Sequence, residues 1–302
     1  MTSQKPRDAG RTGPADPEAL PIMPAMLRGW PLPEPSGTKY GRGQVFVIGG
    51  SRATPGAVLL AGLAALRVGA GRLTLAVAES VAPALAVAVP EAGVRGLAED
   101  DDGEVSGAGV EGLGKDLERS DVVLLGPGLG RPGGTARLLT AVVAALPEET
   151  PVVLDAFALG VLPDLPDVAR SLAGRLVLTP NLEEAARLLG REEIEDPDDA
   201  ALAVAREYRA VVSCRGSISD GERLWRATTG HTGLGTSGSG DVQAGALAGL
   251  LARGAEPAQA AVWSTHLHTS AGDSLTARVG KVGFLAREVL DELPRILNEL
   301  TV

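Results

Sequence analysis

Short apolar runs alternate along this chain with longer segments of helical character. The apolar runs predict strands at residues 44–48, 72–77, 121–125, 152–155, 176–179 and 211–214. Helical segments are predicted between them, at residues 56–68, 135–146, 182–189 and 200–208. This alternation is typical of a mostly parallel sheet with helices on both faces. The sequence therefore predicts an α/β fold.

The two ends of the chain depart from the alternation. After residue 226 the pattern changes to three consecutive helices, at about residues 241–253, 257–275 and 284–297. Residues 1–38 show little periodicity, and Pro31, Pro33 and Pro35 oppose a regular helix or sheet ladder. We predict a flexible N-terminal arm over residues 1–38, dispensable for folding and able to pack on a neighbouring subunit, and one domain over residues 39–302.

Composition narrows the classes of partner. The net charge is −10 and no cluster of Lys and Arg is present, which argues against a nucleic-acid surface. The single cysteine, Cys214, excludes an internal disulfide and suits a reducing compartment. The apolar stretches near residues 57–66 and 244–251 are too short to span a membrane. We expect a cytoplasmic protein that binds neither nucleic acid nor membrane.

The segment GTSGSGD at residues 235–241 carries the strongest chemical signal. It opens a predicted helix, and its glycines free backbone N–H groups to form a cradle for a phosphate. Asp241 then faces a substrate hydroxyl. The alternative is that Asp241 is only the N-cap of the helix. In either case the start of a helix favours an ionised carboxylate.

Two more glycine-rich junctions follow predicted strands, at residues 45–71 and 124–130. The first has neither the G-x-G-x-x-G spacing nor a Lys-Ser/Thr pair, so it is not a dinucleotide fingerprint or a P-loop. Tight turns alone explain each junction. Because parallel strands end at one edge of a sheet, however, the three loops are expected to converge there.

The remaining polar candidates favour structural roles. His231 precedes the glycine segment and is interpreted as an exposed loop residue. His266 and His268 lie two apart on a predicted helix and point to different faces, which opposes a shared metal ion and favours packing roles. Glu183 and Glu184 fall in a first helical turn, where the helix dipole stabilises them. No metal site made of protein ligands is predicted.

Taken in order, the motifs GGSxxxPGA, GPGLG, LDAxAL, LTPN and GTSGSGD resemble the ADP/ATP-dependent NAD(P)H-hydrate dehydratase family of the ribokinase-like superfamily. The resemblance covers about residues 39–297. It implies a ribokinase-like three-layer sandwich and a homotetramer. It also implies a lyase of metabolite repair that uses ADP, with ATP as the alternative and Mg²⁺ as its companion, to dehydrate hydrated NADH or NADPH.

The resemblance also implies roles for individual residues. Asp241 would help deprotonate the ring hydroxyl of the hydrated nicotinamide as that hydroxyl attacks the terminal phosphoryl group, and loss of phosphate would restore the double bond. The residues implied to bind this substrate are Ala57, Gly128, Asn181 and Asp241. Those implied to bind the adenine nucleotide are Arg215, Gly216, Ser217, Ile218, Ser219, Gly238 and Gly240.

Three positions depart from the family pattern. Phe157 stands in LDAFAL where a small or acidic residue is usual, Asn181 replaces a histidine, and Arg215 replaces a lysine, with a different donor geometry. These changes leave two alternatives to the dehydratase open. One is a small-molecule kinase of the same superfamily, and the other is a nucleotide-binding relative with weakened activity.

Overall fold

The structure, a computed structural model, describes residues 16–301. Its sheet has ten strands in the order β1-β10-β9-β8-β7-β6-β5-β2-β3-β4. The strands are β1 (Leu20–Ile22), β2 (Gln44–Ile48), β3 (Arg72–Ala78), β4 (Ala92–Leu97), β5 (Val122–Leu125), β6 (Val152–Leu154), β7 (Leu176–Leu178), β8 (Val211–Cys214), β9 (Ser217–Ser219) and β10 (Leu224–Ala227). Only β9 pairs antiparallel with its two neighbours; the other pairs are parallel. The predicted mostly parallel sheet is confirmed.

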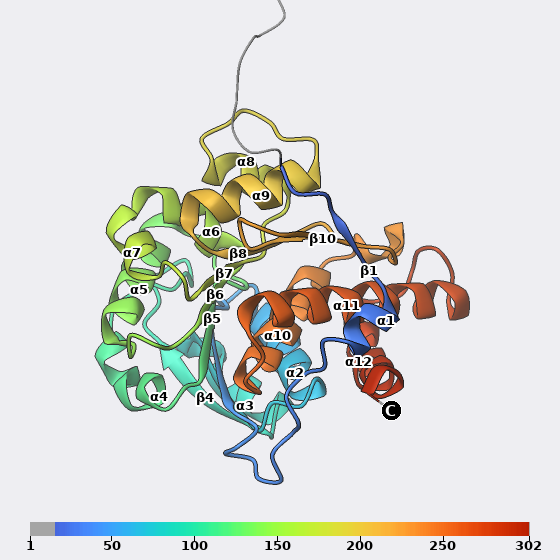
Figure 1. Ribbon diagram of the computed structural model, residues 1–302. Coiled ribbons are helices and arrows are strands. Elements are labelled where there is room, and N and C mark those ends of the chain that lie inside the picture. The colour runs from blue at the N-terminus through green and yellow to red at the C-terminus, as the bar shows by residue number, and fades with distance from the viewer. Residues whose placement is uncertain (1–15, 302) are drawn as a thin grey trace, which may run out of the picture.

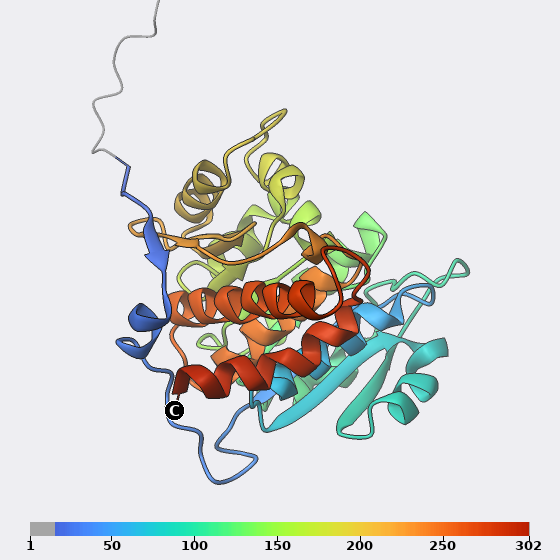
Figure 2. The same ribbon diagram turned by 90° about the vertical axis from the view of Figure 1, so that its right-hand side faces the viewer.

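Helices cover both faces of this sheet (Figures 1 and 2). One face carries α2 (Pro55–Arg67), α10 (Ser239–Ala252), α11 (Pro257–Arg278) and α12 (Ala286–Thr301). The other carries α4 (Gly114–Glu118), α5 (Pro132–Ala145), α6 (Phe157–Val161), α7 (Pro166–Ser171), α8 (Leu182–Leu188) and α9 (Pro197–Tyr208). Short elements complete the chain: α1 (Pro24–Arg28), α3 (Ala82–Ala88), η1 (Glu79–Val81), η2 (Val110–Leu113), η3 (Leu162–Asp164) and η4 (Thr232–Leu234).

Side chains of the central strands divide between the two helical layers. In β2, Val45 and Val47 join the core beneath α2 and α10, whereas Phe46 and Ile48 join the core beneath α5 and α6. Successive residues of a strand point to opposite faces, so a run that is apolar throughout must be covered on both sides. This arrangement is the three-layer sandwich expected from the sequence.

Helices α2 and α10 pack with their backbones in close approach. A Cβ atom on Gly245 would lie 2.0 Å from the carbonyl oxygen of Ala61, and one on Gly249 would lie 2.6 Å from that of Ala65. Any larger residue here would force the helices apart. Because they run side by side in this way, their N-terminal ends reach the same edge of the sheet.

The N-terminal segment differs from its prediction. Strand β1 pairs parallel with β10, the Trp30 ring stacks 6.0 Å from that of Trp225, and Trp263 Nε1 donates to the Trp30 carbonyl over 3.0 Å. The expectation that residues 1–38 lack regular structure is therefore wrong for residues 20–28. Pro31, Pro33 and Pro35 follow these elements, and the side chains of Ile22 and Leu27 are buried in the core of their own chain. Residues 1–15 lie outside the described residues, and the division into arm and domain stays a prediction.

Within residues 16–301, no helix combines the length and the apolar character needed to cross a bilayer. The apolar stretches noted in the sequence form parts of α2 and α10, where they are buried against each other and the sheet.

Candidate active site

The loops after β2 and β5 are joined to each other by hydrogen bonds. Gly50 N donates to the carbonyl oxygen of Pro127, and Ser51 N donates to that of Gly128, each over 2.8 Å. The Thr54 hydroxyl also donates to Gly128 O over 2.7 Å. A Cβ on Gly128, which has φ +70°, would lie 2.4 Å from Thr54 O and 3.1 Å from the Cβ of Ala57. The two substrate-side candidates, Ala57 and Gly128, thus lie next to each other.

The third glycine loop, residues 235–241, lies beside α2, near the loops that follow β2 and β5. Gly238, with φ +86°, is the N-cap of α10, and a Cβ placed on it would lie 2.5 Å from Leu60 Cδ1 and 3.8 Å from Asp241 Oδ2. Leu60 lies one turn beyond Ala57 on α2. The three loops therefore converge, and the third one does so because α10 packs beside α2.

Asp241 is not the N-cap of its helix. Gly238 occupies that position, no side chain makes a capping hydrogen bond there, and Asp241 is the third residue of α10. Burial, and secondarily the charge of Asp155, raises the pKa of Asp241 from its ordinary value to about 7. The expectation of a firmly ionised carboxylate is therefore wrong, because desolvation and a like charge outweigh the helix dipole. A carboxyl with this pKa can accept a proton near neutral pH.

Asp155, at the end of β6, is a site residue that sequence reasoning did not select. Its carboxyl group is buried and accepts a hydrogen bond of 2.7 Å from the Thr179 hydroxyl. Burial raises the pKa of Asp155 to about 6, although the bonds from Thr179 and from the Ala156 backbone oppose the rise. Asp155 in turn raises the pKa of both Asp241 and Glu184. The available signal was its place directly after a buried strand.

The residues after Asp155 adopt a strained turn. Ala156 has φ 50° and ψ −123°, a conformation rare for a residue with a Cβ, and strain of this kind is concentrated at functional sites. Phe157 is the first residue of α6, and its ring packs against the hydrophobic core on that face of the sheet. Core packing thus accommodates Phe157 in the place where the family pattern has a small or acidic residue.

Asn181 and Glu184 form a capping box at the start of α8. Glu184 N donates to Asn181 Oδ1, and Asn181 N donates to Glu184 Oε2, each over 2.9 Å. Burial, with the charge of Asp155 as a further cause, raises the pKa of Glu184 to about 7. The side-chain oxygen of Asn181 is therefore engaged in helix capping.

The predicted nucleotide segment, residues 215–219, is mostly built into the sheet. Arg215 and Gly216 form the two-residue turn between β8 and β9, and both have positive φ, as type I′ hairpin turns require. The Ser217 hydroxyl donates to Asp198, and the Ser219 hydroxyl donates to the Arg223 carbonyl, while Ile218 and both serines are buried. The exposed Arg215 and partly exposed Gly216 remain available to a ligand.

The three histidines have separate partners. His231 Nδ1 lies 2.7 Å from Asp273 Oδ1 in an exposed loop. His266 and His268 are 4% and 6% exposed on α11, which confirms the packing roles predicted for them. His268 Nε2, however, lies 2.8 Å from the Ser239 hydroxyl in the glycine loop, a contact that the sequence did not reveal.

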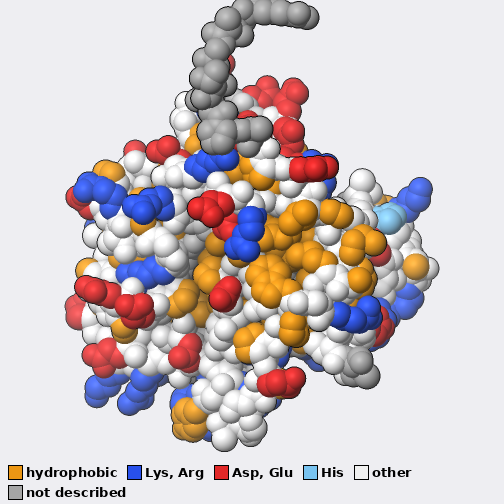
Figure 3. All heavy atoms as spheres, viewed as in Figure 1, with side chains coloured by type: hydrophobic (Ala, Val, Ile, Leu, Met, Phe, Trp, Pro, Cys, Tyr) orange, Lys and Arg blue, Asp and Glu red, His pale blue; other side chains and the backbone are white. Residues whose placement is uncertain are grey.

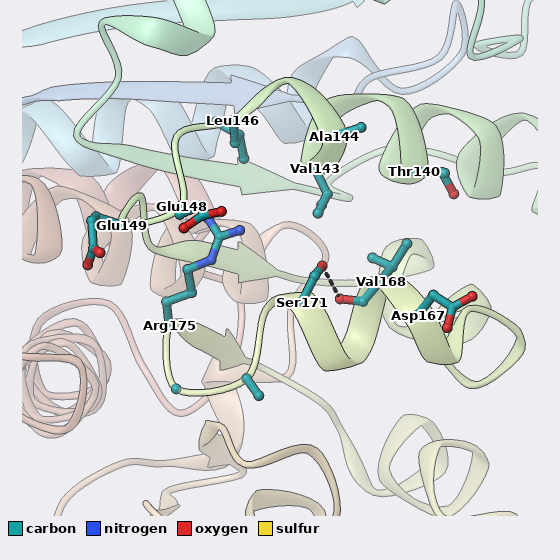
Figure 4. Close-up of a pocket in the computed structure, with 12 residues that line it drawn as sticks. Thr140, Val143, Ala144, Leu146, Glu148, Glu149, Asp167, Val168, Ser171 and Arg175 are labelled. Atoms are coloured by element: carbon teal, nitrogen blue, oxygen red, sulfur yellow. Dashed lines mark hydrogen bonds between the residues drawn. The ribbon is translucent and has the colours of Figure 1, made fainter.

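Other features of the described residues lie apart from this edge. No group of three or more His, Cys, Asp or Glu among residues 16–301 is placed to hold a metal ion. A hollow of about 870 Å³ lies between α5 and α7, near the starts of β6 and β7 (Figure 4). Arg175 in its wall already donates to the carbonyl of Thr150 over 2.7 Å. This hollow lies at the amino-terminal ends of the strands, whereas Asp155 and Asp241 lie at the carboxyl-terminal ends.

Comparison with known proteins identifies the family of this chain. The sequence profile of the NAD(P)H-hydrate dehydratase family matches residues 45–295. The chain belongs to this family. It is 44% identical over 292 residues to the ADP-dependent (S)-NAD(P)H-hydrate dehydratase of Xanthomonas campestris, covering 94% of this chain and 98% of that protein.

The chain is also similar to longer relatives and to solved structures. The bifunctional NAD(P)H-hydrate repair enzyme of Moorella thermoacetica is 37% identical over 89% of this chain, which spans 52% of that protein. The ADP/ATP-dependent NAD(P)H-hydrate dehydratase of Bacillus subtilis, crystallised with ATP and Mg²⁺, has a TM-score of 0.76 at 26% identity, covering 93% of this chain and 99% of that one. A hydroxyethylthiazole kinase from Pyrococcus horikoshii, at 21% identity and a TM-score of 0.58, shares the fold. The ribokinase-like fold is confirmed.

Proposed function

We propose that this chain is an ADP-dependent (S)-NAD(P)H-hydrate dehydratase and that Asp241 is its catalytic base. The observation that carries the proposal is the position of Asp241. Its carboxyl lies in the first turn of α10, after a glycine loop that contacts α2 beside Ala57, and its pKa is about 7. The 44% identity over nearly the full length of the Xanthomonas enzyme supports the choice of reaction.

The reaction proceeds in two steps. The ring hydroxyl of the hydrated nicotinamide attacks the terminal phosphorus of ADP, Asp241 takes the hydroxyl proton, and AMP leaves. The phosphate ester then loses phosphate together with a ring proton, which restores the double bond of NADH or NADPH. Phosphoryl transfer depends mainly on alignment and charge stabilisation, so the backbone N–H groups at the start of α10 supply much of what the first step needs.

The proposed binding residues divide between two sides of the loops. Ala57, Gly128, Asn181 and Asp241 would contact the hydrated nicotinamide. On the nucleotide side, Arg215 and Gly216 lie at an accessible turn, and Gly238 and Gly240 at the start of α10. Ser217, Ile218 and Ser219 would contribute through the strand that positions this turn. ATP is the alternative phosphoryl donor.

Mg²⁺ fits this site as a companion of the nucleotide. Magnesium binds one or two carboxylates together with phosphate oxygens and water, and the buried carboxyl of Asp155 would serve as such a ligand while Asp241 stays free to take the proton. Bound there, it would neutralise charge on the phosphates. The proton transfer is still carried out by Asp241.

We further propose a cytoplasmic homotetramer. Hydrophobic side chains gather over β1, α1 and α11 on the face shown in Figure 3. Leu20 in β1 is 52% exposed and Met23, just before α1, is 48% exposed. Patches of this kind mark interfaces. Light scattering after gel filtration tests the assembly, and a monomer would contradict it.

The activity test uses hydrated NADH with ADP or ATP. Recovery of the absorbance of reduced nicotinamide, together with release of AMP from ADP, is the expected result. A phosphorylated product without elimination would indicate a small-molecule kinase. Nucleotide binding without turnover would indicate a relative that has lost activity.

A further inference from the structure

Helix α11 presents polar side chains to the loop that leads into α10. The Thr269 and Thr229 hydroxyls are 2.7 Å apart, Gly230 N donates to Asp273 over 3.0 Å, and the Ser239 hydroxyl lies 2.8 Å from His268 Nε2. These contacts hold the loop at its beginning and at its end. The last of them lies two residues from Asp241.

The contact between Ser239 and His268 is buried. Ser239 is 3% exposed and His268 is 6% exposed. Burial lowers the pKa of His268 to about 4, so the ring is neutral at physiological pH. A neutral imidazole and a hydroxyl that are bonded to each other and buried hold each other in one orientation. Rotation of either group would leave both without a hydrogen bond, which is costly away from water.

The two glycines beside Ser239 supply no side-chain restraint of their own. Gly238 has no side chain to cap α10, and Gly240 has no Cβ to limit its backbone. Glycine has the largest conformational freedom of any residue, and ordering it costs the most entropy. Ser239 is the residue between these two glycines, so a bond to its side chain restrains both.

We propose that His268 is a positioning residue for the phosphate cradle. Through Ser239 it holds the backbone of Gly238 and Gly240 in the orientation that the terminal phosphate of the nucleotide requires. This inference rests on the proposed function for its ligand. The contact itself is independent of the reaction.

Three variants separate positioning from general stability. His268→Leu removes the bond to Ser239, and His268→Gln keeps a side-chain N–H that can reach the same oxygen. His266→Leu is the matched control, since His266 is equally buried on α11 and has Ser270 of its own helix as its side-chain partner, at 3.3 Å. We expect His268→Leu to lower kcat about tenfold or more through misalignment, with a smaller change in KM for ADP. His268→Gln and the control should stay within about threefold.

A second measurement does not depend on catalysis. Hydrogen exchange of the peptide covering residues 228–240, in the protein without nucleotide, should accelerate in His268→Leu and remain unchanged in His266→Leu. If the parent protein does not turn over hydrated NADH, the proposed function fails and this comparison still decides the inference. Equal losses in both Leu variants, or parent-like kcat and exchange in His268→Leu, would overturn it.

Discussion

Replacing Asp241 with Asn should make the protein more stable at alkaline pH while abolishing most of its activity. The unfolded chain releases the Asp241 proton near pH 3.8, whereas the folded chain retains it until about pH 7. Folding therefore takes up a proton between these values, and the buried carboxylate destabilises the native state increasingly as pH rises. Asn carries no charge to bury.

The magnitude follows from the two pKa values. Each pKa unit is worth about 1.4 kcal/mol, so the full penalty at high pH is on the order of 4 kcal/mol. Between pH 5 and pH 8, Asp241→Asn should gain about 2 to 3 kcal/mol in free energy of unfolding relative to the parent. Comparing differences across pH removes the cost of burying the amide itself, which is the same at each pH.

Urea denaturation at pH 5, 6.5 and 8 measures this gain. Asp167→Asn is the control, because its side chain is 90% exposed and should give parallel curves. Turnover of hydrated NADH by Asp241→Asn should fall by roughly 10²-fold or more, since the general base is lost. A stability difference that is constant from pH 5 to pH 8 would refute the buried, partly protonated carboxyl. Near-normal turnover would refute its catalytic role.

Three other predictions follow from the same site and from the N-terminal segment. Asp155→Asn removes the negative charge beside Asp241 and lowers its pKa, so the acidic limb of the kcat/KM profile should move to lower pH; an unmoved limb would separate the two groups. Asn181→His should raise turnover of hydrated cofactor while costing about 1 kcal/mol of stability through loss of the α8 cap, as measured by kinetics and urea denaturation; unchanged or lower kcat/KM would indicate a different substrate. A chain beginning at Lys39 should fold with a lower Tm, because Trp225 and Trp263 lose their contacts with Trp30; an unfolded product would contradict an independent domain, and an unchanged Tm would contradict the packing.

The sequence predicts the central strands and long helices well because their apolar periodicity is strong. It misses β4, whose six residues include Gly93, Arg95 and Gly96, because a half-exposed edge strand needs no apolar run. It also misses β1, whose pairing with β10 depends on a contact between distant parts of the chain. Tertiary pairing of this kind leaves no local pattern.

The candidate site divides in the same way. Glycine loops that follow strands are visible in the sequence, so the place of Asp241 is predictable. The protonation of Asp241 is not predictable, because it depends on burial and on Asp155, which lies on another strand. Likewise the bond from His268 to Ser239 joins two helices whose spacing only the folded chain sets.

The pairing of β1 with β10 bears on the order of events during folding. The Thr228 hydroxyl donates to the Ile22 carbonyl across a separation of 206 residues in the chain. Closing so large a loop is slow compared with forming neighbouring strand–helix units. Residues 20–30 are therefore made long before β10, and Trp30 has no Trp225 ring to stack on until β10 has been made. During that interval, a chaperone that recognises apolar segments would be able to bind the nascent chain there.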